Sequence, residues 1–347
     1  MAGVHAVLPQ HRYAQADITS AFTEMCLGPG GNEALLARLH RNSRVSNRHL
    51  VLPLEQYATL TGFKESNDLF IAHAVRLGAE ALTGALERAC IAAADVDVVF
   101  STTVTGIAVP SIEGRIGQLV GLRPDVKRVP LFGLGCVAGA AGIARLHDYL
   151  TGHPNEVGAL ISVELCSLTV QRDDRSVANL VASGLFGDGA AAVVGVGANR
   201  PEPGPRVIDS RSRLYPDTES ALGMDVGAGG LRIVLDAQVP VLVKQTLGAD
   251  IRSLLEAHSL QVDEVEAWVS HPGGPKVIEA IEAELGLPGD PLELTWRSLD
   301  QVGNLSSSSV LHILRDTLDQ RSLTPGAAGM MTSMGPGFCS ELVLLEW

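Results

Sequence analysis

Cys136 is the residue of this chain whose setting best suits nucleophilic chemistry. It follows Gly133 and Gly135 and precedes an Ala- and Gly-rich segment that is compatible with a helix. Glycines let the backbone turn tightly, and the positive end of a helix lowers the pKa of a thiol. The motif therefore predicts a reactive thiolate, although a cysteine among small residues is, on its own, just as typical of a buried structural position.

Two other residues could act on a group attached to that sulfur. His271 lies between the apolar segment VEAWVS and a Pro- and Gly-rich turn, at a predicted strand end, where α/β folds place their chemistry. Asn304 opens a predicted helix, and its amide could donate to an oxygen that gains negative charge. Taken singly, His271 fits an ordinary turn and Asn304 fits a helix cap. If the three meet, His271 would favour the thiolate of Cys136.

The elements that must position these residues alternate between short Val- and Ile-rich segments and longer Ala- and Leu-rich segments. Such alternation is typical of an α/β chain. Strands are predicted at residues 96–101, 159–163, 190–196, 265–270 and 342–345, and helices at residues 66–94, 137–149, 239–257 and 306–318.

Two stretches of the chain resemble each other in the same order. DVDVVFSTT resembles DEVEAWVSHPG, Cys136 and Asn304 each follow a glycine and open an apolar helix, and GALISVE resembles AGMMTSMG. The number of residues that separates matching positions is nearly constant, so we predict an internal duplication. The simpler interpretation is that all α/β segments look alike. Two related halves packed face to face would point Cys136 and Asn304 into one central cavity.

Composition limits the possible functions. The 347 residues carry a net charge of −13, which argues against a general nucleic-acid binder because that role needs a basic face. The five cysteines are scattered, so neither a disulfide framework nor a zinc site is expected, and a reducing cytoplasm is predicted. Neither a signal peptide nor a membrane span is predicted, because Gly, Ser or charged residues interrupt the apolar segments.

Several motifs taken together resemble the type III polyketide synthases, relatives of chalcone and stilbene synthases. They are GCVAGAAG around Cys136, LFGDGAAAVV, SHPGGPKVIEAIE around His271, GNLSSSSV around Asn304, and MGPGF. The resemblance spans essentially the whole chain and is nearest to bacterial members that make alkylresorcinols or alkylpyrones. It implies a thiolase-like α/β fold of duplicated, five-layered αβαβα architecture, with one half at residues 1–205 and the other at residues 206–347.

The resemblance also implies a reaction. Cys136 would accept a starter acyl group from acyl-CoA, and His271 and Asn304 would hold the thioester carbonyl of malonyl-CoA while carbon dioxide leaves. The resulting enolate would attack the acyl group on Cys136, and repeated cycles would give a chain that closes to a resorcinol or a pyrone. No cofactor is implied beyond the CoA thioesters that serve as substrates, and a cytoplasmic homodimer is expected.

Further positions match the wall of the family's cavity. Phe186 matches the gatekeeping phenylalanine at its mouth, and Val109 matches the residue that crosses the dimer interface to close the partner's cavity. Ile233 stands where many plant members have phenylalanine, which favours an aliphatic starter. The other expected wall residues are Thr103, Cys166, Thr169, Leu231, Ser306, Gly335 and Pro336.

A basic segment could bind the phosphates of CoA. Arg38, Arg41, Arg44 and Arg48 lie close together in the sequence, and phosphates need cationic donors. Arg38 matches a CoA-contact position of the family, and Arg41 lies beside it. The same arginines fit a solvated basic helix face equally well.

Three other functions remain open at this stage. An initiator ketosynthase of fatty-acid synthesis also uses Cys, His and Asn, but the residues after His271 and the Gly-Pro-Gly motif match it less well. A catalytically silent thiolase-fold scaffold is a second possibility. A thiol protease is the third, and the signatures that such enzymes carry around the nucleophile are absent from this sequence.

Overall fold

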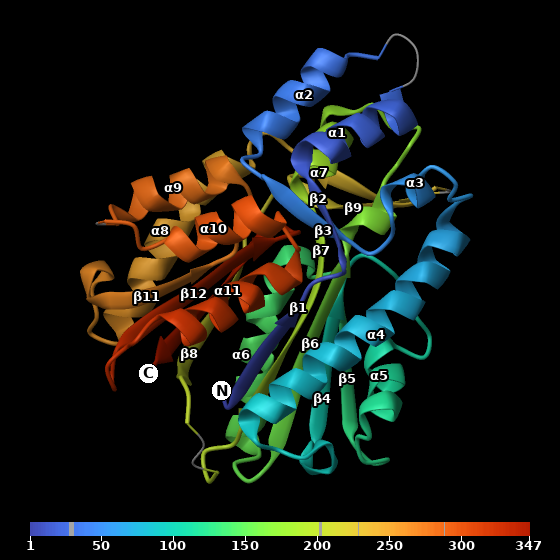
Figure 1. The fold of residues 1–347 in the computed structure, drawn as a ribbon. Coiled ribbons are helices and arrows are strands. Elements are labelled where there is room, and N and C mark those ends of the chain that lie inside the picture. Colours follow the sequence, from blue (N-terminus) through green and yellow to red (C-terminus); the bar gives the residue numbers. More distant parts are fainter. Residues whose placement is uncertain (28–30, 201–202, 228, 288) are drawn as a thin grey trace.

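Two mixed β-sheets form the centre of the protein in this computed structural model, which describes residues 1–27, 31–200, 203–227, 229–287 and 289–347 (Figure 1). The first sheet has the order β1-β7-β6-β4-β5 and the second the order β11-β12-β13-β8. The strands of the first sheet are β1 (Gly3–Val7), β4 (Val98–Thr103), β5 (Lys127–Phe132), β6 (Val157–Leu165) and β7 (Asp188–Val196). Those of the second are β8 (Arg206–Leu214), β11 (Val265–Ser270), β12 (Ala328–Gly335) and β13 (Cys339–Glu346).

The two sheets repeat one pattern of strand directions. In the first, β4 runs parallel to β6, while β7 runs antiparallel to both β6 and β1. In the second, β11 runs parallel to β12, while β13 runs antiparallel to both β12 and β8. Only β5, parallel to β4, extends the first sheet beyond this shared order. The common topology agrees with the internal duplication predicted from the sequence.

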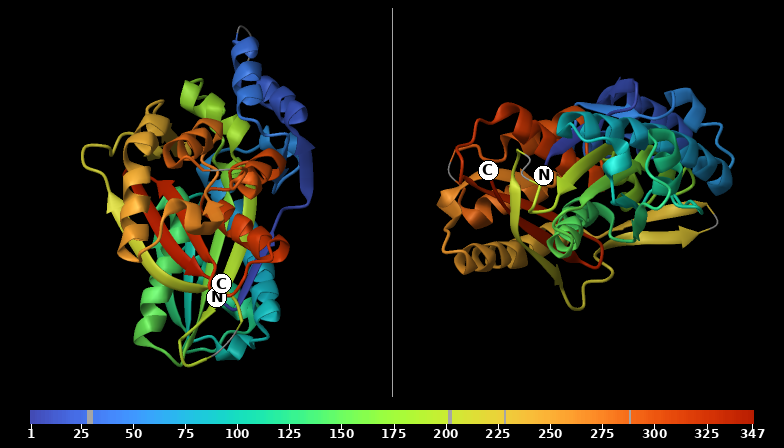
Figure 2. Two further views of the ribbon diagram at one scale, coloured as in Figure 1. Left: turned by 90° about the vertical axis from the view of Figure 1, so that its left-hand side faces the viewer. Right: turned by 90° about the horizontal axis from the view of Figure 1, so that it is seen from below.

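Helices cover both outer faces and fill the space between the sheets (Figures 1 and 2). On the first sheet lie α4 (Phe63–Ala89) and α5 (Ile112–Val120), and on the second lie α8 (Val239–Ala257) and α9 (Pro275–Leu285). Between the sheets lie α6 (Ala138–Gly152) and α11 (Ser307–Gln320), with α10 (Glu293–Val302) beside α11. These are the five layers that the family resemblance implied.

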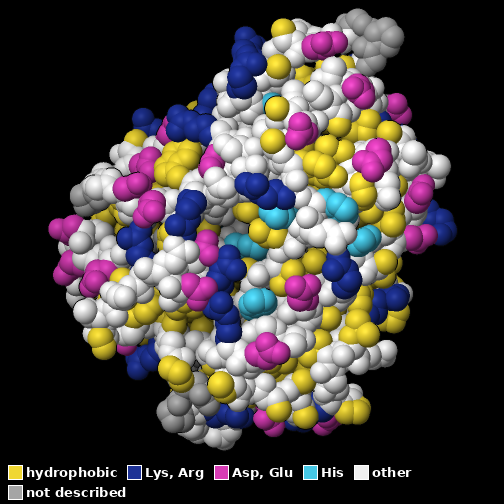
Figure 3. All heavy atoms as spheres, in the orientation of Figure 1, with side chains coloured by type: hydrophobic (Ala, Val, Ile, Leu, Met, Phe, Trp, Pro, Cys, Tyr) yellow, Lys and Arg dark blue, Asp and Glu magenta, His cyan; other side chains and the backbone are white. Residues whose placement is uncertain are grey.

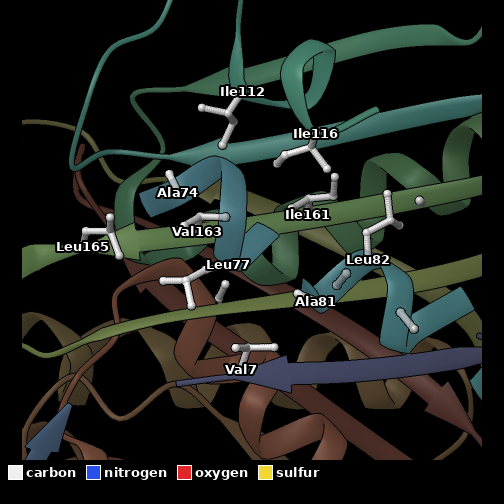
Figure 4. Packing of buried hydrophobic residues seen from close by; sticks show 14 of the residues in the cluster. Val7, Ala74, Leu77, Ala81, Leu82, Ile112, Ile116, Ile161, Val163 and Leu165 are labelled. Carbon is white, nitrogen blue, oxygen red and sulfur yellow. The ribbon is translucent and has the colours of Figure 1, made fainter. Parts of the chain in front are cut away.

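Helix α4 shows how apolar spacing places a helix on a sheet. Its buried residues recur at helical spacing, and Ala74, Leu77 and Ala81 pack with Ile161 and Val163 of β6 (Figure 4). Strand β6 is buried along its entire length, as expected for a central strand covered on both faces. Among the described residues α4 is also the one helix long and apolar enough to cross a membrane, but it forms part of the core of this fold.

The central helices α6 and α11 approach each other closely at Gly139. A methyl group added to Gly139 would lie 2.2 Å from the carbonyl oxygen of Ser307 and 2.6 Å from Cγ1 of Val310. Glycine at this position therefore lets the starts of the two helices meet. Because Cys136 lies just before α6 and Asn304 just before α11, this contact brings the two candidate site residues together.

Replacing Gly139 with alanine is expected to destabilise the protein by about 1–3 kcal/mol, since the clash is with backbone and overpacking costs energies of that order. Urea unfolding followed by circular dichroism would measure the free energy of unfolding. Gly152 at the other end of α6 is a matched control, because a methyl group added there meets nothing within 4 Å. A Gly139→Ala variant as stable as Gly152→Ala would contradict the close approach.

Smaller elements form a cap at one end of the sheets, seen at the top of Figure 1. Phe22, Leu36 and Leu180, from three of its helices, pack together in a small apolar cluster. The cap consists of β2 (His11–Ala14), α1 (Gln15–Phe22), η1 (Thr23–Leu27), α2 (Glu33–Asn42), β3 (Asn47–Leu50), α3 (Leu54–Tyr57), α7 (Val177–Leu185), β9 (Leu222–Gly227) and β10 (Gly230–Leu235). Short helical turns occur at η2 (Ala93–Asp95), η3 (Gly135–Val137), η4 (Cys166–Thr169) and η5 (Val262–Glu264).

The structure corrects several predicted boundaries. The helix expected at residues 66–94 begins at Phe63 and ends at Ala89, because Cys90 adopts a left-handed conformation with φ of 54°. The helix at 239–257 and the strand at 265–270 coincide with α8 and β11. The strand expected at 342–345 is longer in both directions, as β13.

Candidate active site

Cys136 lies in the short turn η3, directly before α6, and is half-buried. The preceding residue, Gly135, has φ of 56°, a conformation that glycine adopts without strain. The thiol of Cys136 donates a hydrogen bond to Oγ of Ser306 over 3.6 Å. The nucleophile candidate is therefore held against the start of α11.

His271 follows β11 and is only 2% exposed. Its backbone N–H donates to the carbonyl of Thr332 in β12 over 2.9 Å, which continues the sheet ladder past the strand end. Its Nδ1 is buried without a hydrogen-bond partner. Its Nε2 lies 3.4 Å from Nδ2 of Asn304.

Asn304 is joined to the gatekeeper position by backbone hydrogen bonds. Its N–H donates to the carbonyl of Leu185 and its carbonyl accepts from the N–H of Gly187, each over 2.9 Å, so Phe186 and Asn304 form an isolated parallel bridge. Gly303 permits this contact, because a methyl group there would lie 2.7 Å from the carbonyl oxygen of Leu185. The end of α7 and the Asn304 loop therefore hold each other in place.

The orientation of the Asn304 amide follows from its neighbours. Its Oδ1 accepts the backbone N–H of Ser306 over 2.8 Å, so its Nδ2 is the atom that faces the imidazole of His271. Ser306 has φ of 50°, which is rare outside glycine and is tolerated where the surroundings hold it. Contacts thus run from Cys136 through Ser306 and Asn304 to His271, and this chain joins the three residues that the sequence singled out.

The electrostatic state of the site corrects one prediction. Burial raises the pKa of Cys136 to about 12, with the Ser306 contact opposing the shift, and burial lowers the pKa of His271 to about 3. The helix start does not produce the lowered thiol pKa expected from the sequence, because desolvation of the sulfur outweighs it. The resting site therefore holds a neutral thiol and a neutral imidazole.

Buried histidines should make the protein sensitive to acid. Burial is the main cause that lowers the pKa of His40 to about 4, of His271 to about 3 and of His312 to about 3, whereas the unfolded chain binds protons near pH 6.5. The unfolded state then holds more protons below that pH, so stability falls as pH falls. The slope is about 1.4 kcal/mol per pH unit for each histidine between roughly pH 6 and pH 4.

Urea unfolding at several values of pH in this window would measure that slope. A His312→Gln variant should show a slope smaller by about one histidine's share, because His312 is outside the candidate site and bonds the carbonyl of Ala190 over 3.0 Å. A His312→Gln variant with the same slope as the wild type would show that His312 titrates normally in the folded protein.

A buried carboxyl group lies behind the nucleophile. Glu164 accepts hydrogen bonds from Ser307 over 2.5 Å, from Thr105 over 3.0 Å and from the backbone N–H of Val104 over 3.1 Å. Burial raises the pKa of Glu164, while these donors oppose the shift. Ser307 and Ser308 also contact Oγ of Ser162 over 2.8 Å each. The serine run after Asn304 is therefore a buried hydrogen-bonding segment of α11.

Cys136 opens onto a largely apolar cavity that extends into the cap. A concave, mostly apolar lining with a few polar groups is typical of sites that bind organic ligands. Of the residues that the sequence placed on the wall, Phe186, Cys166, Thr169, Ile233, Ser306 and Pro336 line it. Helices α1 and α7 add Ile18, Phe22, Asn179, Ala182 and Ser183, which the sequence did not indicate.

Four expected wall residues lie elsewhere. Thr103 donates to Glu164 over 3.3 Å, and its neighbours Val104 and Thr105 line the cavity instead. Leu231 lines an adjoining polar cavity that also contacts Thr169. Gly335 packs against the Cys136 turn, where an added methyl group would lie 2.8 Å from the backbone N of Val137. Val109 is 90% exposed, outside this cavity.

The basic segment divides into three environments. Arg38 and Arg41 are exposed on α2, on a face where Figure 3 shows Lys and Arg side chains. Arg44 pairs with Glu279 over 2.6 Å and lies over the ring of Trp296. Arg48 is buried and lines the main cavity. Only Arg38 and Arg41 therefore remain candidates for binding CoA at the surface.

Comparison with known proteins gives consistent matches along the chain. Residues 5–200 match the family description "Chalcone and stilbene synthases, N-terminal domain", and residues 207–346 match "Chalcone and stilbene synthases, C-terminal domain". The 1,3,6,8-tetrahydroxynaphthalene synthase of Streptomyces peucetius subsp. caesius is 52% identical, over 100% of this chain and 93% of that protein. The "Alpha-pyrone synthesis polyketide synthase-like Pks18" of Mycobacterium tuberculosis is 29% identical, over 99% and 90%.

The crystal structure of 1,3,6,8-tetrahydroxynaphthalene synthase from Streptomyces coelicolor A3(2) superposes with a TM-score of 0.94. It is 29% identical in sequence, and the match covers 99% of this chain and 98% of that one. The fold and site thus define a condensing enzyme of the thiolase-like fold. The chain belongs to the chalcone and stilbene synthase family: it is a type III polyketide synthase, an acyltransferase that condenses malonyl-CoA iteratively.

These matches refine the sequence-based predictions. The family is confirmed, but the relative at 52% identity makes tetrahydroxynaphthalene, so the expected nearness to alkylresorcinol or alkylpyrone synthases is not supported. Family matches across both halves also remove the initiator ketosynthase, the silent scaffold and the thiol protease as alternatives.

Proposed function

We propose that Cys136 is the acyl acceptor of this enzyme and that His271 and Asn304 polarise the malonyl thioester. The sulfur of Cys136 bonds to the acyl carbon, the bond from that carbon to the sulfur of CoA breaks, His271 takes the thiol proton on Nε2, and the departing sulfur is protonated by water. Asn304 Nδ2 and the protonated Nε2 of His271 then donate to the enolate oxygen that forms as carbon dioxide leaves malonyl-CoA. The enolate carbon attacks the acyl carbon and releases the sulfur of Cys136, which takes the proton back from His271.

The contact chain from Cys136 through Ser306 and Asn304 to His271 carries this proposal. It joins a nucleophile, which lines an apolar cavity together with Phe186 and Ser306, to two polar groups that are themselves buried. The neutral resting state suits the chemistry. The neutral imidazole of His271 is able to accept the thiol proton, and the transfer occurs when a thioester is in place to bond with the sulfur. Burial then strengthens every contact to the developing oxyanion.

For the product, we propose a polyhydroxylated fused aromatic made from malonyl units alone. The support is the relative at 52% identity, whose name gives a naphthalene with hydroxyl groups on alternate carbons. That pattern results when two-carbon units derived from malonyl-CoA are joined without reduction and the chain is then cyclised.

Incubating the purified enzyme with malonyl-CoA alone and identifying products by mass spectrometry tests the product proposal. We expect a tetrahydroxynaphthalene, or the quinone formed from it in air, and release of carbon dioxide without any added starter. Turnover only after an alkyl acyl-CoA is added would instead favour the second candidate, which is a resorcinol or pyrone built on an aliphatic starter. The apolar side chains of Ile18, Phe22 and Met25 in the cavity favour that candidate.

For the assembly, we propose a homodimer that covers the exposed apolar side chains beside β5. Phe132 is 59% exposed at the end of β5, which is an edge strand of the first sheet among the described residues, and Val109 is 90% exposed in the loop between β4 and α5. Sedimentation equilibrium would give the mass in solution, and Val109→Asp should shift it toward the monomer. A wild-type protein that sediments as a monomer would refute the proposal. Cytoplasmic location stays a prediction.

For CoA binding, we propose that exposed Arg38 and Arg41 contact its phosphates. Charge-assisted contacts of this kind favour binding and leave the chemistry unchanged. An Arg38→Ala, Arg41→Ala double variant should therefore raise KM for malonyl-CoA with little change in kcat. Exposed Arg206, at the start of β8 and outside the cap, is a matched control.

A further inference from the structure

Arg48 is a buried cation on the wall of the main cavity. In β3, alternate side chains face inward, so Arg48 and Leu50 share the buried face, and both line the cavity. Arg48 is 3% exposed. Charged side chains are almost never buried to this degree unless every polar atom has a partner.

Two of the three guanidinium nitrogens of Arg48 are satisfied. Nε donates to Oε1 of Gln15 over 3.1 Å, and Nη1 donates to the carbonyl of Phe186 over 2.7 Å. These contacts hold the guanidinium between α1 and the gatekeeper residue. Nη2 is buried and has no hydrogen-bond partner.

The charge of Arg48 also lacks a directly bonded carboxylate among the residues that the structure describes. Asp188 is near enough to favour the charged form, but its oxygens accept from the backbone N–H of Val51 and from the backbone and hydroxyl of Ser167. Burial lowers the pKa of Arg48 to about 10, so it remains a cation at neutral pH. A positively charged side chain with one unpaired donor therefore belongs to a largely apolar wall.

We propose that Nη2 of Arg48 binds a distal oxygen of the acyl chain carried on Cys136, so that the cavity selects oxygen-bearing chains over plain alkyl chains. The ligand class is a poly-β-keto acyl thioester, whose carbonyl or enolate oxygens recur along the chain. This specificity role rests on the function proposed above, in which Cys136 carries the chain. Pairing the cation in a water-poor cavity is favourable because an unpaired charge-assisted donor is costly there.

Single-turnover loading of Cys136 would test this role. The full-length enzyme is mixed with hexanoyl-CoA, its ω-keto analogue or adipoyl-CoA, and acylation is followed by intact-protein mass spectrometry. The same three kinds of acyl-CoA are then tested at shorter and longer chain lengths, to find the length at which the end group reaches Arg48. Wild-type enzyme is expected to load the keto or carboxylate chain at least about tenfold faster than the alkyl chain at one length, which corresponds to about 1.4 kcal/mol.

Two variants of Arg48 and one matched control separate selectivity from structure. Arg48→Met should remove the preference, so that the three end groups load at similar rates, and Arg48→Lys should keep part of it. Gln15→Met removes the partner of Nε but leaves Nη2 in place, so it should keep the preference. Thermal unfolding of each variant shows whether it is folded.

The outcomes distinguish the possibilities. A wild-type enzyme without an end-group preference at any chain length overturns the proposal, whatever the variants do. If Arg48→Met and Gln15→Met each slow the loading of all three chains by the same factor, Arg48 only supports the gatekeeper loop. Malonyl-CoA is included as a further acyl donor. If neither malonyl-CoA nor any other acyl-CoA loads Cys136, the proposed function itself is overturned, an outcome distinct from loss of the end-group preference alone.

Discussion

A Cys136→Ala variant is expected to lose polyketide formation by a factor of about 10⁴ or more, because its sulfur is the atom that we propose holds the growing chain as a thioester. The structure supports this size of effect through geometry. Cys136 is the thiol that faces the start of α11, where Ser306 and Asn304 connect it to His271. Removing the sulfur leaves the proposed oxyanion donors in place but takes away the atom on which we propose that the chain is built.

Cys166 provides the matched control for this experiment, since it lines the same cavity and is also half-buried. Intact-protein mass spectrometry after incubation with acyl-CoA should detect an adduct on the wild type and on Cys166→Ala but none on Cys136→Ala. If the adduct persisted on Cys136→Ala and disappeared from Cys166→Ala, the nucleophile would be Cys166, and the catalytic centre would differ from the one proposed.

An Asn304→Asp variant is expected to slow decarboxylation of malonyl-CoA by about 10²–10³-fold, the usual effect of removing one oxyanion donor. The replacement keeps an oxygen that can accept the N–H of Ser306 but replaces the amide nitrogen that lies 3.4 Å from His271. It also brings a negative charge toward an enolate. Loading of the starter on Cys136 should fall by less than about tenfold, because the sulfur contacts Ser306 and not Asn304.

Carbon dioxide release and acyl loading can be measured separately in the same preparation, so the two steps report on different residues. Ser309→Ala is a suitable control, because its hydroxyl accepts the N–H of Leu305 over 2.7 Å in the same loop but does not contact the three candidate residues. The specific donor role would be contradicted if Asn304→Asp lost decarboxylation and loading to the same extent and Ser309→Ala showed the same losses. That result would indicate a disturbed loop.

The neutral resting state connects both predictions. Cys136 and His271 shift in opposite directions for one reason, which is that burial disfavours the charged form of each. A thiol that stays protonated between turnovers is protected from oxidation and from stray electrophiles, since the thiolate is the reactive form. Substrate binding then has to supply the conditions for proton transfer.

Much of the fold and the identity of the three candidate residues could be predicted from the amino-acid sequence alone. The apolar periodicities located β11 and α8 at their observed limits, and the repeated order of motifs indicated two similar halves, which the matching sheet topologies support. Residue type and local pattern were sufficient to select Cys136, His271 and Asn304 as candidates. Each lies beside a glycine or at a strand end that can be recognised in the sequence.

Burial, orientation and charge state depended on the tertiary structure. The sequence placed Arg48 with Arg38 and Arg41 in one basic cluster, but strand alternation turns Arg48 into the cavity while α2 keeps the others at the surface. Likewise, the sequence predicted a thiolate from the helix start, yet burial of the sulfur in the folded protein raises the pKa of Cys136. The residues that bury these side chains and form their hydrogen bonds are far away in the sequence. Local sequence patterns therefore cannot predict them.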